Sequence, residues 1–197
     1  MQPLERFFRD LDSAWSPIGP QPIRLTIIGS AALMLQASYE RGTKDSDILE
    51  TREITPAVAE QLKRLAGRET RLAKRHRLHV DIVRNGLPFL PQRLNCHKMH
   101  NLNAGLSNFE VEVLDVVDVV VSKLKRFNGN DRADIGSMID LELVPRERLI
   151  ERFRDASDYF SCDDRAVDLP KYLANLHHVE RDLMGLSPTD VRLPDWI

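Results

Sequence analysis

The chain has few cysteines and no long apolar run, and each absence excludes a class of protein. Cys96 and Cys162 are the only cysteines in 197 residues, too few for a disulfide framework, so we expect a reducing, cytoplasmic compartment. No stretch approaches the roughly 18–20 apolar residues that cross a bilayer. The longest apolar stretch, residues 116–121, is interrupted by Asp118. The first residues show no basic region followed by an apolar run, so we expect neither a secretory signal nor a membrane partner.

The chain also lacks an excess of charge of either sign. Lys and Arg number 28 and Asp and Glu number 30, which leaves a formal net charge of −2. This balance excludes a protein that wraps nucleic acid by bulk charge, although a local basic face remains possible. A hydrophobic fraction of 42% in a chain of this length supports a folded core of one domain, or of one domain with a small appendage.

The apolar periodicity predicts strands and helices in a mixed order. We expect strands at 23–28, 47–50, 78–83 and 109–114, and helices at 4–14, 30–37, 56–66 and 115–127. From residue 131 to about 184 the pattern is helical, with breaks near Pro145 and over 161–170. We therefore predict an α/β (α+β) fold, with a mixed-sheet core over 1–128 and a helical C-terminal region over 129–197.

The first candidate site feature is the junction between the first strand and the following helix. The strand ends at Gly29 and the helix begins at Ser30. Backbone N–H groups at a helix start, together with a serine hydroxyl, form a site suited to a phosphate. Glycine there lets the backbone approach a ligand closely.

Three aspartates form the second feature. Asp45 and Asp47 lie two residues apart on an extended segment, which places both side chains on one face. Asp81 lies within a strand where an apolar residue is expected. If the strands pair side by side, the carboxylates converge, and a divalent cation such as Mg²⁺ or Mn²⁺ would relieve their repulsion and hold a triphosphate. Taken singly, Asp-x-Asp is also typical of a solvated turn, and a strand aspartate is typical of a sheet edge.

These segments together resemble a known superfamily. The sequences IIGSAAL at 27–33, RGTKDSDI at 41–48 and HVDIV at 79–83 resemble the DNA polymerase β-type nucleotidyltransferases. Within these, the pattern is similar to the small bacterial branch that includes the abortive-infection AbiEii-type toxins. The resemblance covers about residues 22–140 and implies transfer of a nucleoside monophosphate from an NTP, with release of pyrophosphate.

The resemblance also implies roles for individual residues. It makes Asp45 and Asp47 the metal-binding pair and Asp81 the third carboxylate, which acts as base for the incoming hydroxyl. It makes Gly29 and Ser30 the residues that contact the phosphates.

Further nucleotide contacts are expected from residues outside these motifs. Arg41 and Thr43 precede the carboxylates, and the forked donors of an arginine suit phosphate, although Arg41 in a loop also suits an ion pair with a nearby Asp. By the resemblance, Lys123 binds the triphosphate and Asp131 supports the site. The alternative is that Asp131 and Asp134 cap the next helix.

The acceptor of the transferred group is left open by the sequence. Residues 63–77 carry seven Lys and Arg side chains and only Glu69 in opposition, which suits an RNA such as tRNA but also a solvated helix end. A protein hydroxyl is the other acceptor. The resemblance implies a toxin restrained by a separately encoded antitoxin. Two other readings remain, namely an inactive nucleotide-binding module and an enzyme that modifies a small aminoglycoside.

Overall fold

The computed structural model describes residues 2–37, 39–40, 42–162 and 164–193, which form two compact units. The first unit comprises residues 1–87 and 96–114, and the second comprises residues 88–95 and 115–197. The boundary that the sequence predicts near residue 128 lies within the second unit.

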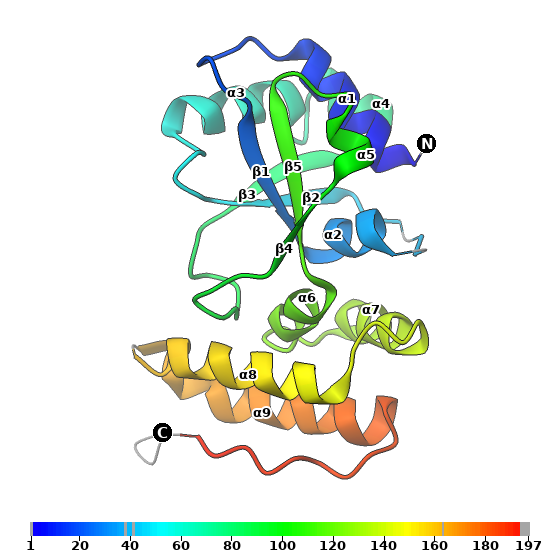
Figure 1. Cartoon of the computed structure of the whole chain (residues 1–197), viewed down its shortest axis with the longest axis vertical. Coiled ribbons are helices and arrows are strands. Elements are labelled where there is room, and N and C mark those ends of the chain that lie inside the picture. The colour runs from blue at the N-terminus through cyan, green and yellow to red at the C-terminus, as the bar shows by residue number, and fades with distance from the viewer. Residues whose placement is uncertain (1, 38, 41, 163, 194–197) are drawn as a thin grey trace. The chain divides into compact units, whose positions relative to one another are not determined.

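The first unit combines helices with five strands (Figure 1). In chain order these elements are α1 (Pro3–Ala14), β1 (Ile23–Ile28), α2 (Gly29–Gln36), β2 (Asp45–Leu49), α3 (Pro56–Ala66), α4 (Arg71–His76), β3 (His79–Val83), β4 (Cys96–Lys98), α5 (His100–Asn103) and β5 (Phe109–Leu114).

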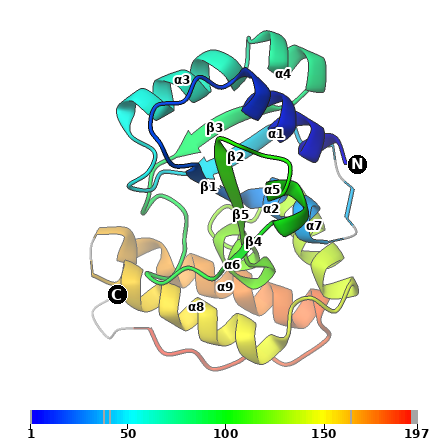
Figure 2. The same ribbon diagram turned by 45° about the horizontal axis from the view of Figure 1, so that its top comes forward.

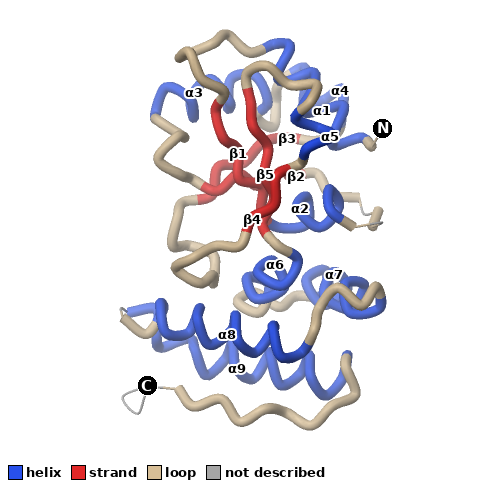
Figure 3. Tube along the Cα trace, in the orientation of Figure 1, coloured by secondary structure: helices blue, strands red, loops and turns tan. Residues whose placement is uncertain are grey.

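The five strands form one mixed sheet in the order β3-β2-β1-β5-β4 (Figure 3). Strand β1 lies at its centre, parallel to β5 and antiparallel to β2. Strand β3 runs parallel to β2, and β4 runs antiparallel to β5. The prediction of a mixed sheet flanked by helices is therefore confirmed.

One face of the sheet is apolar and carries the core of this unit. The register pairs Leu25 with Val111 and Ile27 with both Val113 and Ile48, and all five side chains are fully buried. Helices α1, α3 and α4 pack against one another on one side of the sheet (Figure 2). Side chains alternate between the two faces along a strand, so the residues between these buried ones point to the opposite face of the sheet.

The other face combines polar side chains with buried apolar ones such as Ile28, Leu49 and Leu114. Thr26 of β1 donates a hydrogen bond of 2.7 Å to Glu112 of β5, and Arg24 lies 3.4 Å from Glu110. The carboxylates of β2 and β3 lie on this same face, because Asp47 pairs with Ile28, two residues beyond Thr26. The fold thus presents acidic side chains on a rigid surface.

The second unit is helical, as the sequence predicts. It contains α6 (Val116–Lys123), α7 (Gly129–Asp140), α8 (Arg146–Phe160), a 3₁₀ turn (Asp164–Asp168), α9 (Leu169–His178) and a final π-type turn (Val179–Leu183). Its core includes Phe89, and the ring centroids of Phe153, Phe160 and Tyr172 all lie within 5.4 Å of the Phe89 ring centroid. Among the described residues, no helix is long and apolar enough to cross a membrane.

A buried ion pair fastens residues 88–95 to these helices. Arg152 donates to both carboxylate oxygens of Asp118 at 2.6 and 2.8 Å, and Asp118 also accepts from the backbone N–H of Asn95. Arg152 further donates to the carbonyl of Arg93 at 2.6 Å. The hydrogen bond that Arg152 donates to Asp118 is the main reason that the pKa of Arg152 is raised, and it outweighs burial.

Several element boundaries differ from those predicted. Helix α6 ends at Lys123 rather than at residue 127, because the chain turns through Phe127, whose φ of 48° lies in the left-handed region. Helices α4 and α5 and strand β4 had no counterpart in the prediction. Each of these three elements spans six residues or fewer, too short to show a clear apolar period.

Candidate active site

The register of β2 and β3 places the three predicted aspartates on one face of the sheet. Asp47 is the direct partner of Asp81, and Asp45 is the direct partner of His79. Cross-strand partners point to the same face of a sheet, and residues two apart do so as well. Asp45, Asp47, His79 and Asp81 therefore share one face.

Distances between side chains agree with this register. His79 Nε2 lies 3.1 Å from Asp81 Oδ2 and 3.9 Å from Asp45 Oδ1. The two carboxylates thus approach the same imidazole nitrogen. The side chains of Asp45 and Asp81 are each 52% exposed, whereas that of His79 is only 8% exposed. The carboxylates are accessible to a ligand, and the imidazole supports them from within the fold.

His79 is a candidate site residue that the sequence interpretation did not single out. An ionised carboxylate only accepts hydrogen bonds, so the bond to Asp81 requires the proton on Nε2 of His79. The sequence did contain a signal that could have identified it. His79 and Asp81 are two residues apart, the same spacing that places Asp45 and Asp47 on one face of a strand.

The junction of β1 and α2 lies directly beside Asp47. Gly29 has φ +65°, a conformation that favours glycine, and a Cβ built there would lie 3.0 Å from Oδ2 of Asp47. Helix α2 begins at Gly29 with no side-chain cap from Ile28. The start of this helix, next to Ser30, therefore lies beside the carboxylate of Asp47, and such a helix start is suited to a phosphate.

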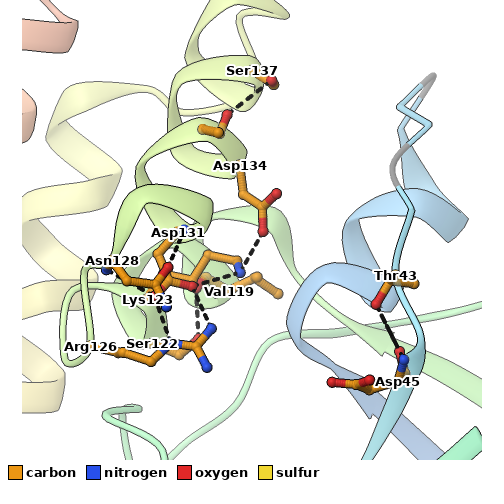
Figure 4. A network of polar contacts seen from close by, with 11 residues as sticks. Thr43, Asp45, Val119, Ser122, Lys123, Arg126, Asn128, Asp131, Asp134 and Ser137 are labelled. Atoms are coloured by element: carbon orange, nitrogen blue, oxygen red, sulfur yellow. Dashed lines mark hydrogen bonds and ion pairs between the residues drawn. The ribbon is translucent and has the colours of Figure 1, made fainter.

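The loop before β2 holds Asp45 in place. Thr43 Oγ1 donates a 3.1 Å hydrogen bond to the carbonyl of Asp45 and accepts one of 3.4 Å from its N–H (Figure 4). The hydroxyl of Thr43 is therefore engaged with the backbone of a candidate ligand residue, and its predicted phosphate contact remains a prediction. Arg41, which the sequence also assigns to the nucleotide, lies outside the described residues.

Lys123 belongs to a buried cluster in the second unit. Its Nζ lies 2.6 Å from Oδ2 of Asp134 and 3.3 Å from Oδ1 of Asp131 (Figure 4). The Lys123 side chain is 7% exposed, and both carboxylates are almost fully buried. The triphosphate contact predicted for Lys123 thus stays a prediction, and the ammonium already has two carboxylate partners.

Asp131 of this cluster also starts helix α7. Asn128 accepts from the N–H of Asp131, and Asp131 accepts from the N–H of Asn128, which confirms the capping alternative for Asp131. Asp134 is not part of this capping box and instead pairs with Lys123. Burial alone would raise the pKa of the Asp131 carboxyl. Hydrogen bonds from Arg126 and the charges of Lys123 and Arg126 outweigh it and hold this pKa below its usual range.

The side chains on β2 and β3 suit a Mg²⁺ ion better than a metal ion whose ligands all come from the protein. In the parts of the chain that the structure describes, no three His, Cys, Asp or Glu side chains converge on one metal position. Mg²⁺ is usually held by one or two carboxylates, with water and substrate phosphates completing its coordination. An exposed carboxylate, that of Asp45, lies on this face, and a Cβ at residue 29 would crowd the carboxylate of Asp47 at the start of α2. This arrangement is compatible with such an ion.

Comparison with known proteins adds one result to this geometry. No curated protein and no solved structure matches the chain. A family described as nucleotidyltransferases of unknown function, DUF6036, matches residues 6–182 and so includes β1, β2, β3 and most of the helical second unit. On the strength of this match over most of its length, the chain belongs to the DUF6036 family of nucleotidyltransferases.

Proposed function

We propose that the protein transfers a nucleoside monophosphate from an NTP to a hydroxyl group, with Mg²⁺ or Mn²⁺ held by Asp45 and Asp47. The observation that carries this proposal is the pairing of Asp47 with Asp81 beside the N-terminus of α2. The membership in a nucleotidyltransferase family supports it.

Each part of the site has a task in this reaction. Gly29 and Ser30 would receive the phosphates of the NTP at the start of α2. Asp81 would accept the proton of the acceptor hydroxyl, whose oxygen forms a bond to the α-phosphorus while the bond to pyrophosphate breaks. When bound, the metal ion would neutralise phosphate charge and lower the pKa of the hydroxyl.

His79 would act through Asp81 as a positioning residue. Its Nε2–H holds Oδ2 of Asp81, which leaves the other carboxylate oxygen for the incoming hydroxyl. The imidazole is itself fixed by burial and by its place opposite Asp45 in the register. This arrangement keeps the acid–base group oriented without a contribution from a mobile loop.

The proposal also covers the acceptor of the transferred group and the biological role of the protein. An RNA such as tRNA, or a protein, would supply the hydroxyl. The resemblance to AbiEii-type proteins suggests a toxin that a separately encoded antitoxin restrains. We further propose a cytoplasmic location, where the free thiols of Cys96 and Cys162 stay reduced.

The test follows the α-phosphate. Purified protein is incubated with α-³²P-labelled NTPs, Mg²⁺, total RNA and total protein, and the labelled fraction is identified. We expect label on RNA or protein with the native chain and a loss of about 10³-fold or more with Asp45→Asn and Asp47→Asn. Asp164→Asn, an exposed aspartate of the second unit, serves as control. Equal labelling by all variants would contradict the proposed site.

A further inference from the structure

A strongly basic surface covers the end of α3, the following turn and α4. Its members, which we call the basic surface, are Lys63, Arg64, Arg68, Arg71, Lys74, Arg75 and Arg77. All seven side chains are exposed, and Glu69 is the one carboxylate within this segment. The whole chain carries a net charge of −2, so the excess of positive charge in this segment is not a property of the chain as a whole.

The surface is built on an ordered scaffold. Thr70 caps α4 by accepting from the N–H of Ala73 at 3.1 Å. His76 at the other end lies 2.8 Å from Asp10 of α1 and fixes α4 against that helix. Arg71, at the start of α4, therefore projects from a fixed backbone rather than from a mobile tail.

The cations of α4 lie along one side of the helix. Arg71, Lys74 and Arg75 have the i, i+3, i+4 spacing that groups side chains on a single helix face. Arg71 and Arg75 are separated by about 6 Å along the helix axis. This spacing lets successive side chains contact separate anionic groups.

Most of this charge is not neutralised by ion pairs with the residues that the structure describes. Lys74 pairs with Glu69 at 3.4 Å and Arg75 with Asp10 at 3.0 Å, in exposed positions where ion pairs are weak. Lys63, Arg64, Arg68, Arg71 and Arg77 form no ion pair with any residue that the structure describes. Five cations are therefore available to a polyanion.

The composition of the surface indicates which polyanion fits. Five of its seven cations are arginines, whose forked donors match phosphate oxygens. Residues 63–77 contain no Phe, Tyr or Trp on which unpaired bases would stack. None of the large exposed apolar side chains that the described residues contain falls in this segment, so it lacks the anchors of a membrane-binding surface. These features favour the phosphodiester backbone of a folded RNA.

The basic surface leads directly into the candidate active site. Arg77 is two residues before His79, whose N–H donates to the carbonyl of Lys44 at 2.9 Å. Lys44 precedes Asp45, the register partner of His79. A backbone held along α4 would thus end beside the carboxylates.

We propose that the basic surface binds the phosphodiester backbone of a folded RNA, and that this RNA supplies the acceptor hydroxyl. The second part rests on the proposed function, whereas binding itself does not depend on transfer. Neutralising several phosphates releases counterions, so the affinity should fall steeply with salt.

The experiment measures fluorescence anisotropy of a labelled, transcribed tRNA over a KCl series, without NTP. The surface variant is Arg64→Gln, Arg68→Gln and Arg71→Gln together. Its control, with the same change of net charge on the second unit, is Lys171→Gln, Arg181→Gln and Arg192→Gln together. We expect the surface variant to bind about 10- to 100-fold more weakly, with the log–log salt slope reduced by about 2.

The outcomes separate this inference from the proposed function. Wild-type affinity of the Asp47→Asn variant, with weak binding by the surface variant, supports RNA docking even if no transfer is detected. Equal affinities of the surface variant and its control would overturn the inference. So would equal binding of a duplex DNA, or tighter binding to phosphatidylserine vesicles than to RNA, since either result assigns the surface to a different partner. Circular dichroism melting of both variants confirms that they fold.

Discussion

Replacement of Gly29 by alanine tests the contact between the start of α2 and the carboxylate of Asp47. The native residue has φ +65°, and an alanine held in that conformation costs about 1–2 kcal/mol. Its Cβ would also lie 3.0 Å from Oδ2 of Asp47, so the carboxylate has to move by a few tenths of an ångström. The substitution therefore combines a small loss of stability with a displaced metal ligand.

Two measurements separate these effects. For a chain of this size, the lost stability corresponds to a fall in melting temperature of about 2–8 °C. Hydrogen exchange should place the loss in β1 and β2, within the first unit. Mn²⁺ affinity in the presence of NTP, measured by electron paramagnetic resonance, and the rate of nucleotidyl transfer should each fall by about tenfold or more, because misplacement of a reacting group by a fraction of an ångström is strongly felt.

Gly136 provides the matched control. It lies inside α7, and a Cβ there meets nothing within 4 Å. Gly136→Ala should leave Mn²⁺ affinity unchanged and stabilise the helix by up to about 1 kcal/mol. Full stability together with undiminished Mn²⁺ binding by Gly29→Ala would refute the reasoning about this contact.

Three further predictions concern the buried and supporting groups. Lys123→Met leaves the carboxylate of Asp134, which is 0% exposed, without its closest cation, and urea unfolding should show a loss of about 3–5 kcal/mol; a loss below 1 kcal/mol contradicts it. Burial alone would raise the pKa of Glu180, but hydrogen bonds from Thr189 and Arg146 hold it below its ordinary 4.5. The ionised carboxylate therefore stabilises the fold above pH 4.5, and this contribution is lost as the pH falls through the lower pKa that Glu180 has in the folded state. Glu180→Gln should flatten this part of the pH profile of the unfolding free energy, and an unchanged profile counts against the role of Glu180. His79→Leu should lower transfer at least tenfold while RNA binding persists, and partial recovery in His79→Gln, which keeps an N–H donor, distinguishes positioning from packing.

Much of the first unit could be predicted because its strands have distinct patterns. The β-branched run Ile23–Ile28 and the alternating Phe109–Leu114 appear in the structure with the predicted limits. Helix α3 begins with the predicted Thr55-Pro56 pair. In contrast, the three-residue strand Cys96–Lys98 is defined by its pairing with β5, and a pairing partner cannot be recognised from so short a sequence.

The candidate site could be predicted in part for the same reason. The period of two placed Asp45 and Asp47 on one face, but their alignment with Asp81 depends on β3 lying next to β2, and strand order is a property of the whole fold. The burial of Lys123 against Asp134 could not be predicted, because it depends on how α7 packs against α6.

Tracking both ends of one NTP tests the central claim most directly. The native chain is supplied with Mg²⁺, tRNA and either α-³²P- or γ-³²P-labelled NTP, and the products are separated. The account predicts that the α label enters the acceptor while the γ label leaves as pyrophosphate in equal amount, and that Asp81→Asn abolishes both. Transfer of the γ label to the acceptor, or formation of both products at native rates by the Asp81 variant, would contradict it.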